Sequence, residues 1–428
     1  MAKLWQTVST SLHPMVERYT VGNDYKLDKK ILPFDIEASI AHVKGLEKIG
    51  VITAQELVQI VAGLNEILEK FQRGEFIIQQ SDEDCHTAIE NYLVEKLGTL
   101  GKKVHTGRSR NDQVLVATRL YTRKKLKQIS ENVIELEKVF LNFAKKYKGV
   151  PMPGYTHTRR AMPSSIAHWA AAYLEELINN HMLLETAYKL NDQNPLGAAA
   201  GFGVNLNLQR KYTTELMDFK RTQINSLYCV NSRGTTESYI LSVLTQIMMT
   251  LGRLSTEMIL FTTPEFDFFH LPYQYTTGSS IMPQKRNPDI FEILRSNVGV
   301  IVGLQTQVKD ICKDLISGYN RDTQLTKEPL IKGMGIARRS LEVVALVMKD
   351  VEPKVENLQQ AMTAELFATH AVNRHVKTGL AFRDAYQKVK EDIEHLEKID
   401  PKKALEEVVS LGGPGNLGLE NYVLDRPL

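Results

Sequence analysis

The chain has 428 residues, of which 43% are hydrophobic and 24% are charged, as is ordinary for a globular protein of two or three packed units. Its 53 basic and 50 acidic residues leave a net charge of +3. This near-balance excludes two classes of protein: one dominated by a polybasic nucleic-acid-binding tail and an acidic disordered chain. Three distant cysteines, Cys85, Cys229 and Cys312, exclude a disulfide framework and a C-x-x-C zinc motif. With no apolar run of about 20 residues and no signal-peptide pattern, we expect a cytoplasmic protein.

Apolar residues recur with helical periodicity along most of the chain. Alternation with a period of two is scarce, so we expect no large sheet. Long apolar stripes need partners, and a mainly α-helical bundle supplies them. The stripes are also broad enough to indicate contacts between subunits. In chain order, long helices are expected over about 112–148, 166–184, 240–258, 294–312 and 326–350.

Composition also divides the chain. We expect an N-terminal helical domain over 1–105, a central long-helix domain over 106–350 and a small C-terminal helical domain over 351–428. Segments rich in Gly, Pro, Ser and Asn interrupt the central domain, and the sequence predicts that these breaks carry the chemistry. They lie at 101–111, 150–165, 193–208 and 271–289.

The break at 271–289 has the composition of an anion-binding loop. Lys285 and Arg286 follow a glycine and two serines, and Asn287-Pro288-Asp289 is typical of a helix start. Free backbone N–H groups beside a helix N-terminus attract anions. On composition alone, a solvated loop before a capped helix is equally consistent with this pattern.

Two earlier breaks carry further candidates. Arg108-Ser109-Arg110-Asn111 suits carboxylate or phosphate recognition, and His157 between two threonines suits acid–base chemistry. Solvated arginines and an exposed histidine are the bland alternatives. The basic stretch 102–127 indicates a solvated helix face rather than a nucleic-acid patch. A literal G-x-G-x-x-G match at 413–418 leaves no room for a βαβ unit, so we interpret it as chance.

These segments together resemble a known family. Gly278–Pro288 is similar to the signature loop of the fumarase/aspartase superfamily, and His105–Val114 resembles the segment that marks its argininosuccinate lyase family. Gly154-Tyr155-Thr156-His157 resembles a third region of that family, and Gln284 before Lys285 also fits it. The resemblance extends over roughly 1–345.

The resemblance implies a three-domain, mainly α fold whose central long helices form a tetrameric helical core. It implies a homotetramer with active sites shared between three subunits. The implied reaction is the reversible β-elimination of L-argininosuccinate to fumarate and L-arginine, the last step of arginine biosynthesis. Neither a cofactor nor a metal is expected, and the partners are the small-molecule substrate and like subunits, with no nucleic acid and no membrane.

The resemblance also implies a role for each site residue. Removal of a proton next to a carboxylate produces a carbanion, which positive charge and N–H donors must stabilise. Ser279 matches the base, His157 with its partner Glu292 matches the group on the other side of the site, and Lys285 and Asn287 match the carbanion stabilisers. The implied succinate contacts are Ser109, Arg110, Asn111 and Thr156; the implied arginine-end contacts are Tyr319, Gln324, Lys327, Arg233 and Asp28.

Two departures from the family pattern concern the arginine end. Gly234 follows Arg233 where the family usually has Asp, and Asp24–Asp28 keeps only the final Asp of a Ser-Ile-x-x-Asp pattern. They leave open a sister lyase that releases fumarate from another succinyl-amine adduct. An inactive structural protein of the same fold is less consistent, because the matches to the base, acid partner and cation are all present.

Overall fold

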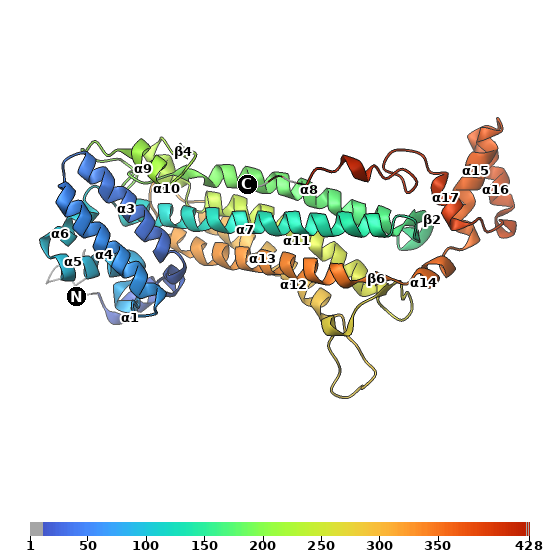
Figure 1. The fold of residues 1–428 in the computed structure, drawn as a ribbon, viewed down its shortest axis with the longest axis horizontal. Coiled ribbons are helices and arrows are strands. Elements are labelled where there is room, and N and C mark those ends of the chain that lie inside the picture. Colours follow the sequence, from blue (N-terminus) through green and yellow to red (C-terminus); the bar gives the residue numbers. More distant parts are fainter. Residues whose placement is uncertain (1–11, 425, 427) are drawn as a thin grey trace. The chain divides into compact units, whose positions relative to one another are not determined.

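The structure is a computed structural model that describes residues 12–424, 426 and 428 (Figure 1). It is mainly helical, as predicted, and the described residues form three sheets of two strands each. The described chain divides into two compact units. Unit 1 comprises 12–128, 184–244 and 302–335, and unit 2 comprises the rest. The three domains expected from the sequence stay a prediction.

Five long helices correspond to the five predicted apolar stripes, so these predictions are confirmed. Each of them contributes residues to both units. Their bounds are α7 (Arg110–Lys146), α8 (Ile166–Asn191), α11 (Thr235–Phe261), α12 (Asp289–Cys312) and α13 (Lys327–Asp350). Apolar periodicity located them because buried stripes are their main source of stability.

Unit 1 packs short helices against the N-terminal part of α7. Its core cluster joins Ala38 and Ala41 to Val116 and Leu120, with Phe219 at its edge. Its remaining elements are α1 (Pro14–Val21), α2 (Asp24–Leu27), η1 (Asp28–Lys30), α3 (Leu32–Lys48), α4 (Ala54–Gln72), η2 (Gln80–Asp82), α5 (Cys85–Leu97), α6 (Thr99–Lys102), η3 (Lys103–His105), β3 (Gln193–Asn194), α9 (Arg210–Leu216), β4 (Arg221–Thr222), α10 (Ser226–Asn231) and η5 (Arg321–Thr326).

A glycine brings two of the long helices close together within unit 1. A β-carbon added at Gly333 of α13 would lie 2.5 Å from Cδ2 of Leu241 on α11. Real side chains do not approach so closely, so the absence of a side chain at Gly333 permits this packing.

Unit 2 corrects the expectation of a plain loop over 150–165. β1 (Pro151–Thr156) and β2 (Arg159–Ser165) form an antiparallel hairpin. In a two-stranded ribbon both strands are edges, so its prolines remove no essential ladder bond. The other elements are β5 (Phe269–His270), η4 (Tyr273–Tyr275), β6 (Glu352–Pro353), α14 (Val355–Gln360), η6 (Ala364–Phe367), α15 (Ala368–Lys377), α16 (Phe382–Glu391), η7 (Ile393–His395), α17 (Pro401–Glu406) and η8 (Leu419–Asn421).

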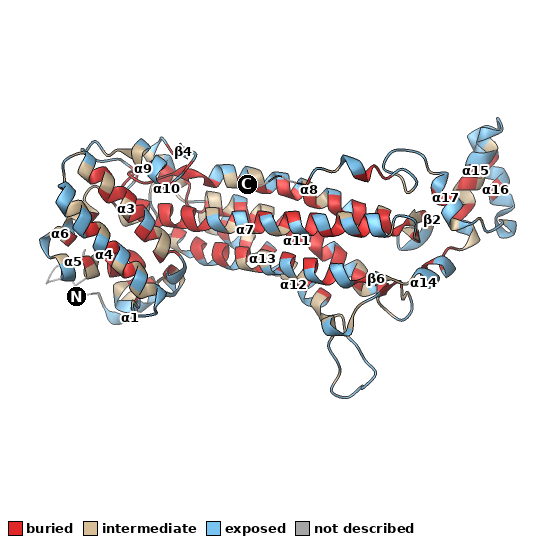
Figure 2. Cartoon of the chain, viewed as in Figure 1, coloured by how far each residue is buried: buried red, intermediate tan, exposed pale blue. Residues whose placement is uncertain are grey.

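The long helices leave apolar side chains uncovered in the single chain. Figure 2 shows exposed positions alternating with buried ones along these helices. The uncovered apolar residues include Met182 and Leu183 on α8, Met249 and Leu260 on α11, Ile293, Val300 and Val302 on α12, and Leu346 on α13. Within the described part of the chain, no helix combines the length and apolar character that crossing a membrane requires.

Candidate active site

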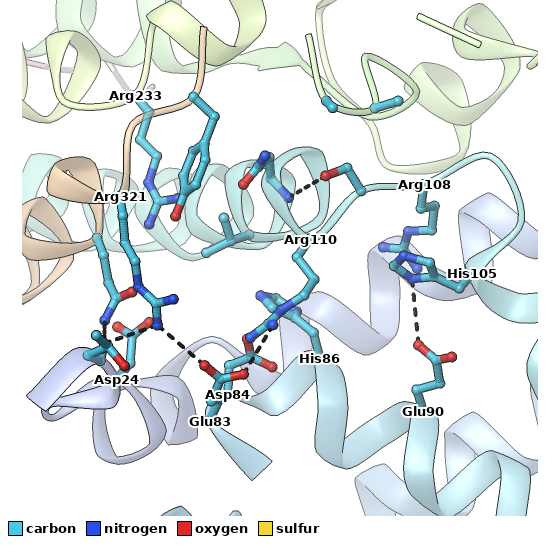
Figure 3. Close-up of a pocket in the computed structure, with 18 of the residues that line it drawn as sticks. Asp24, Glu83, Asp84, His86, Glu90, His105, Arg108, Arg110, Arg233 and Arg321 are labelled. Carbon is cyan, nitrogen blue, oxygen red and sulfur yellow. Dashed lines mark hydrogen bonds and ion pairs between the residues drawn. The ribbon is translucent and has the colours of Figure 1, made fainter. Parts of the chain in front are cut away.

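A cavity of about 1220 Å³ lies in unit 1 and collects side chains from distant parts of the sequence (Figure 3). Seven residues assigned from the family resemblance line it: Ser109, Arg110, Asn111, Arg233, Tyr319, Gln324 and Lys327. Arg108, which the motif Arg108-Ser109-Arg110-Asn111 suggested for anion recognition, also lines the cavity. The sequence motifs assigned no role to other charged lining residues, which include Asp24, Glu83, Asp84, His86, Glu90, His105 and Arg321. For Glu83, Asp84 and His86, the acidic run Asp82-Glu83-Asp84 was the signal available in the sequence.

Asp112 positions the loop that carries Ser109, Arg110 and Asn111. Its buried carboxylate accepts hydrogen bonds from the backbone N–H groups of Ser109 at 3.0 Å, Gly197 at 3.0 Å and Ala199 at 2.9 Å. Burial raises the pKa of Asp112 in spite of these donors and of Arg108. One side chain therefore ties the start of α7 to the glycine-rich segment after β3.

Arg110 is held by two acids. Its guanidinium pairs with Asp84 and, at 3.3 Å, with Oε2 of Glu83, while Oε1 of Glu83 lies 3.3 Å from Nη2 of Arg321. Glu83 has a φ of 68°, a conformation that costs energy for a residue with a side chain. Burial acts to raise the pKa of Asp84, but His86 and Arg110 outweigh it and lower that pKa. The guanidinium of Arg110 is thus fixed in the cavity wall.

Lys327 lies between two carboxylates. Its Nζ is 2.5 Å from Oδ1 of Asp28 and 2.9 Å from Oδ1 of Asp24. Burial acts to lower the pKa of Lys327, but the two carboxylates outweigh it and raise that pKa. Asp28 is fully buried and is absent from the cavity lining, whereas Asp24 lines it. Asp28, an implied substrate contact, therefore reaches the cavity through Lys327.

A buried histidine–aspartate pair stands behind the cavity wall. Nδ1 of His86 is 2.7 Å from Oδ2 of Asp35, which also accepts from Gln113 at 3.1 Å. Burial acts to lower the pKa of His86, but Asp35 outweighs it and raises that pKa. Asp28, Cys85 and His86 have the donor types of a metal site. Lys327 engages the Asp28 carboxylate and Asp35 engages Nδ1 of His86, whereas Nε2 of His86 is buried without a hydrogen-bond partner among the described residues.

The loop that carries Ser279 belongs to unit 2. Backbone hydrogen bonds between Thr277 and Asn287 close it at 3.1 and 2.9 Å. Inside it, Oγ of Ser279 accepts from the N–H groups of Ile281 at 3.3 Å and Met282 at 3.1 Å. α12 begins at Asp289, and Asn287 pairs with Thr277 instead of capping the helix as predicted. A serine oxygen between N–H donors is suited to carry negative charge.

His157 lies at the tip of the β1–β2 hairpin. It and Thr158 both have positive φ, 51° and 59°, as a tight hairpin turn requires. Thr156, His157 and Glu292 are all exposed. Among the described residues of this single chain, no hydrogen bond or ion pair joins His157, Glu292, Ser279 and Lys285 to one another. The structure brings seven of the predicted binding residues together in unit 1. Of the predicted catalytic residues, Ser279 is half-buried and the others are exposed.

Comparison with known proteins decides the family. A lyase family model matches residues 11–303. The argininosuccinate lyase of Thermotoga neapolitana is 43% identical over 389 residues, which are 91% of this chain and 98% of that protein. The argininosuccinate lyase of Sorangium cellulosum is 42% identical over 426 residues, 99% of each chain. This chain belongs to the argininosuccinate lyase family. The resemblance seen in the sequence motifs is confirmed.

Solved structures of more distant proteins show the same fold. EDDS lyase in complex with formate is 22% identical, with a TM-score of 0.81 over 96% of this chain and 89% of that chain. The class II fumarase of Schistosoma mansoni is 17% identical, with a TM-score of 0.73 over 90% and 94%. The predicted fumarase/aspartase-like, mainly α fold is therefore confirmed.

Proposed function

We propose that the protein is an argininosuccinate lyase, which reversibly cleaves L-argininosuccinate to fumarate and L-arginine as the last step of arginine biosynthesis. Relatives of that name match nearly the whole chain at 42–43% identity. The observation that carries the proposal is the cavity in unit 1, where seven implied binding residues from three separate segments meet. Its arginines and Lys327 suit a substrate with several carboxylates.

Ser279 is proposed as the base that removes the proton next to the succinate carboxylate. A serine hydroxyl is a weak base, so its ionised form needs stabilisation. The N–H groups of Ile281 and Met282 point at its oxygen and support this role. Lys285 and Asn287 stabilise the carbanion, whose collapse forms the double bond of fumarate and breaks the bond to the guanidinium nitrogen. His157, oriented by Glu292, supplies the proton that this nitrogen takes up.

Four copies of the chain are proposed to assemble, with Ser279, His157 and the 107–113 loop of one site supplied by different subunits. Uncovered apolar residues such as Met249, Ile293 and Leu346 on the long helices support this assembly. The exposure of His157 and Glu292 also supports it, because exposed side chains can contribute to a site on a second chain. Three unpaired cysteines support the cytoplasm as its location.

The direct test is fumarate release, followed by ultraviolet absorbance, with argininosuccinate as substrate. Adenylosuccinate, malate and aspartate serve as parallel substrates. Release from argininosuccinate alone is expected. Release from another adduct and none from argininosuccinate would keep the elimination chemistry and refute the substrate, whereas no release from any of them would refute the proposed function.

A further inference from the structure

The two carboxylates that face Lys327 differ in how fully they are used. Both carboxylate oxygens of Asp28 have partners, since Oδ1 pairs with Lys327 and Oδ2 accepts a hydrogen bond from the backbone N–H of Cys85 at 3.0 Å. In Asp24 only Oδ1 has a partner, which is Lys327. In the part of the chain that the structure describes, the Asp24 carboxylate has no other hydrogen-bond or ion-pair partner. Asp24 is also the one of the two that lines the cavity. It therefore offers an oxygen to a ligand.

A cation without an acid partner lies near this carboxylate. Arg233 lines the same cavity, is largely buried and packs its guanidinium 5.9 Å from the ring of Tyr319. No acid among the described residues forms an ion pair with it, in contrast to Arg110 and Arg321. Figure 3 shows Arg233 and Asp24 on the same side of the cavity.

Asp24 and Arg233 lie close enough for their charges to interact. Burial, the largest effect, raises the pKa of Asp24, and Asp28 raises it further, while Lys327 and Arg233 lower it. Asp24 and Asp28 share one cation, Lys327. These three groups together carry a surplus negative charge, which a ligand cation would neutralise. Arg233 next to them offers the complementary positive charge for a ligand anion.

We propose that Asp24 and Arg233 together recognise the zwitterionic head group of the arginine moiety. Asp24 accepts hydrogen bonds from the α-ammonium group, and Arg233 donates to the α-carboxylate. Asp24 is thereby a specificity-determining residue for an amino-acid substrate, at a position where the Ser-Ile-x-x-Asp pattern places a neutral serine. The inference rests on the proposed function and adds to it a requirement for the α-ammonium group.

Three ligands of similar length separate the two contacts. L-Arginine carries both head-group charges, 5-guanidinopentanoate lacks the α-ammonium group, and agmatine lacks the carboxylate. Their affinities for the full-length assembled protein are measured by titration calorimetry. In Asp24→Asn we expect a loss of about tenfold to a hundredfold for L-arginine and less than about a twofold change for 5-guanidinopentanoate. In Arg233→Met we expect L-arginine to lose affinity while agmatine keeps its own.

The controls separate this inference from a general disturbance of the cavity. Asp310→Asn makes the same chemical change in an exposed ion pair with Lys313 and should leave all three affinities unchanged. Asp24→Ser is a second variant with the residue of the family pattern, and both Asp24 variants are compared with the parent by thermal unfolding. Equal losses for L-arginine and 5-guanidinopentanoate in a folded Asp24 variant, or no loss for either, would overturn the proposal. Fumarate release by the unsubstituted protein tests the proposed function separately, because it does not depend on how the Asp24 variants change the ligand affinities.

Discussion

The ammonium group of Lys327 lies 2.5 Å from a carboxylate oxygen of Asp28, and neither side chain is appreciably exposed to solvent. The pair connects η1 near the N-terminus to the first residue of α13, 299 positions apart in the chain. A buried charge without its partner is strongly destabilising. This pair therefore decides whether the wall of the cavity is stable.

Replacing Lys327 with Met should lower the free energy of unfolding by about 3–5 kcal/mol, because Asp24 and Asp28 would be left as buried, unpaired carboxylates. Denaturation at neutral pH measures this loss. The loss should shrink as the pH falls, because protonation neutralises Asp24, whose pKa burial raises. Adding Asp28→Asn to Lys327→Met should restore part of the stability; a double variant that is weaker still would contradict the ion-pair explanation.

Gly234 should not tolerate the Asp that is usual in its family. Its φ is +85°, and a β-carbon there would overlap Sγ of Cys312. Gly234→Asp is expected to lower stability by about 2–4 kcal/mol, from backbone strain and the clash together. Cys312→Ala in the same chain should recover the part due to the clash. Equal stability of the parent and the single variant in thermal unfolding would refute this account.

Ser279→Ala should abolish fumarate release, with a fall in kcat of about a thousandfold or more, because the proposed base is lost. Thermal stability should stay within about 0.5 kcal/mol of the parent, since the loop is largely exposed and water can satisfy the N–H groups of Ile281 and Met282. Ser280→Ala is the matched control and should keep most of the activity. Near-normal turnover in Ser279→Ala would remove Ser279 from the mechanism.

The proposed sharing of sites between subunits predicts that two inactive variants can restore each other's activity. Ser279→Ala and Arg110→Gln are separately inactive by expectation, but mixed assemblies contain some sites with both normal residues. Random mixing in equal amounts should recover about a quarter of the parent activity, since each normal loop is present half the time. The mixture is dissociated, reassembled and assayed for fumarate release. A mixture as inactive as its components would refute shared sites.

Glu137 should make stability depend on pH near neutrality. Burial raises the pKa of this α7 carboxyl from 4.5 to about 7, in spite of its pairing with Arg426 at 3.0 Å. The folded protein therefore holds a proton that the unfolded chain releases, so the free energy of unfolding should fall as the pH rises from about 4.5 to 7. Glu137→Gln should remove this contribution. An unchanged pH profile of unfolding in that variant would show that Glu137 titrates normally.

The amino-acid sequence by itself determined the five long helices and the family. Helical periodicity is local information, and it placed α7, α8, α11, α12 and α13 within a few residues of their bounds except at the C-terminal end of α8 and the starts of α11 and α12. The motifs around Ser109, His157 and Ser279 are contiguous, so no knowledge of packing was needed to find them. The hairpin at 151–165 was missed because its prolines are unfavourable in most strands.

Tertiary structure decided which charges are free to meet a ligand. The sequence does not distinguish the roles of Asp24 and Asp28. Only the fold shows that both oxygens of Asp28 are engaged, by Lys327 and Cys85, while one oxygen of Asp24 has no partner among the described residues. The fold likewise places Glu83 between Arg110 and Arg321, with an ion pair to each. Such pairings join residues tens to hundreds of positions apart, and their strength depends on burial, which a local pattern does not encode.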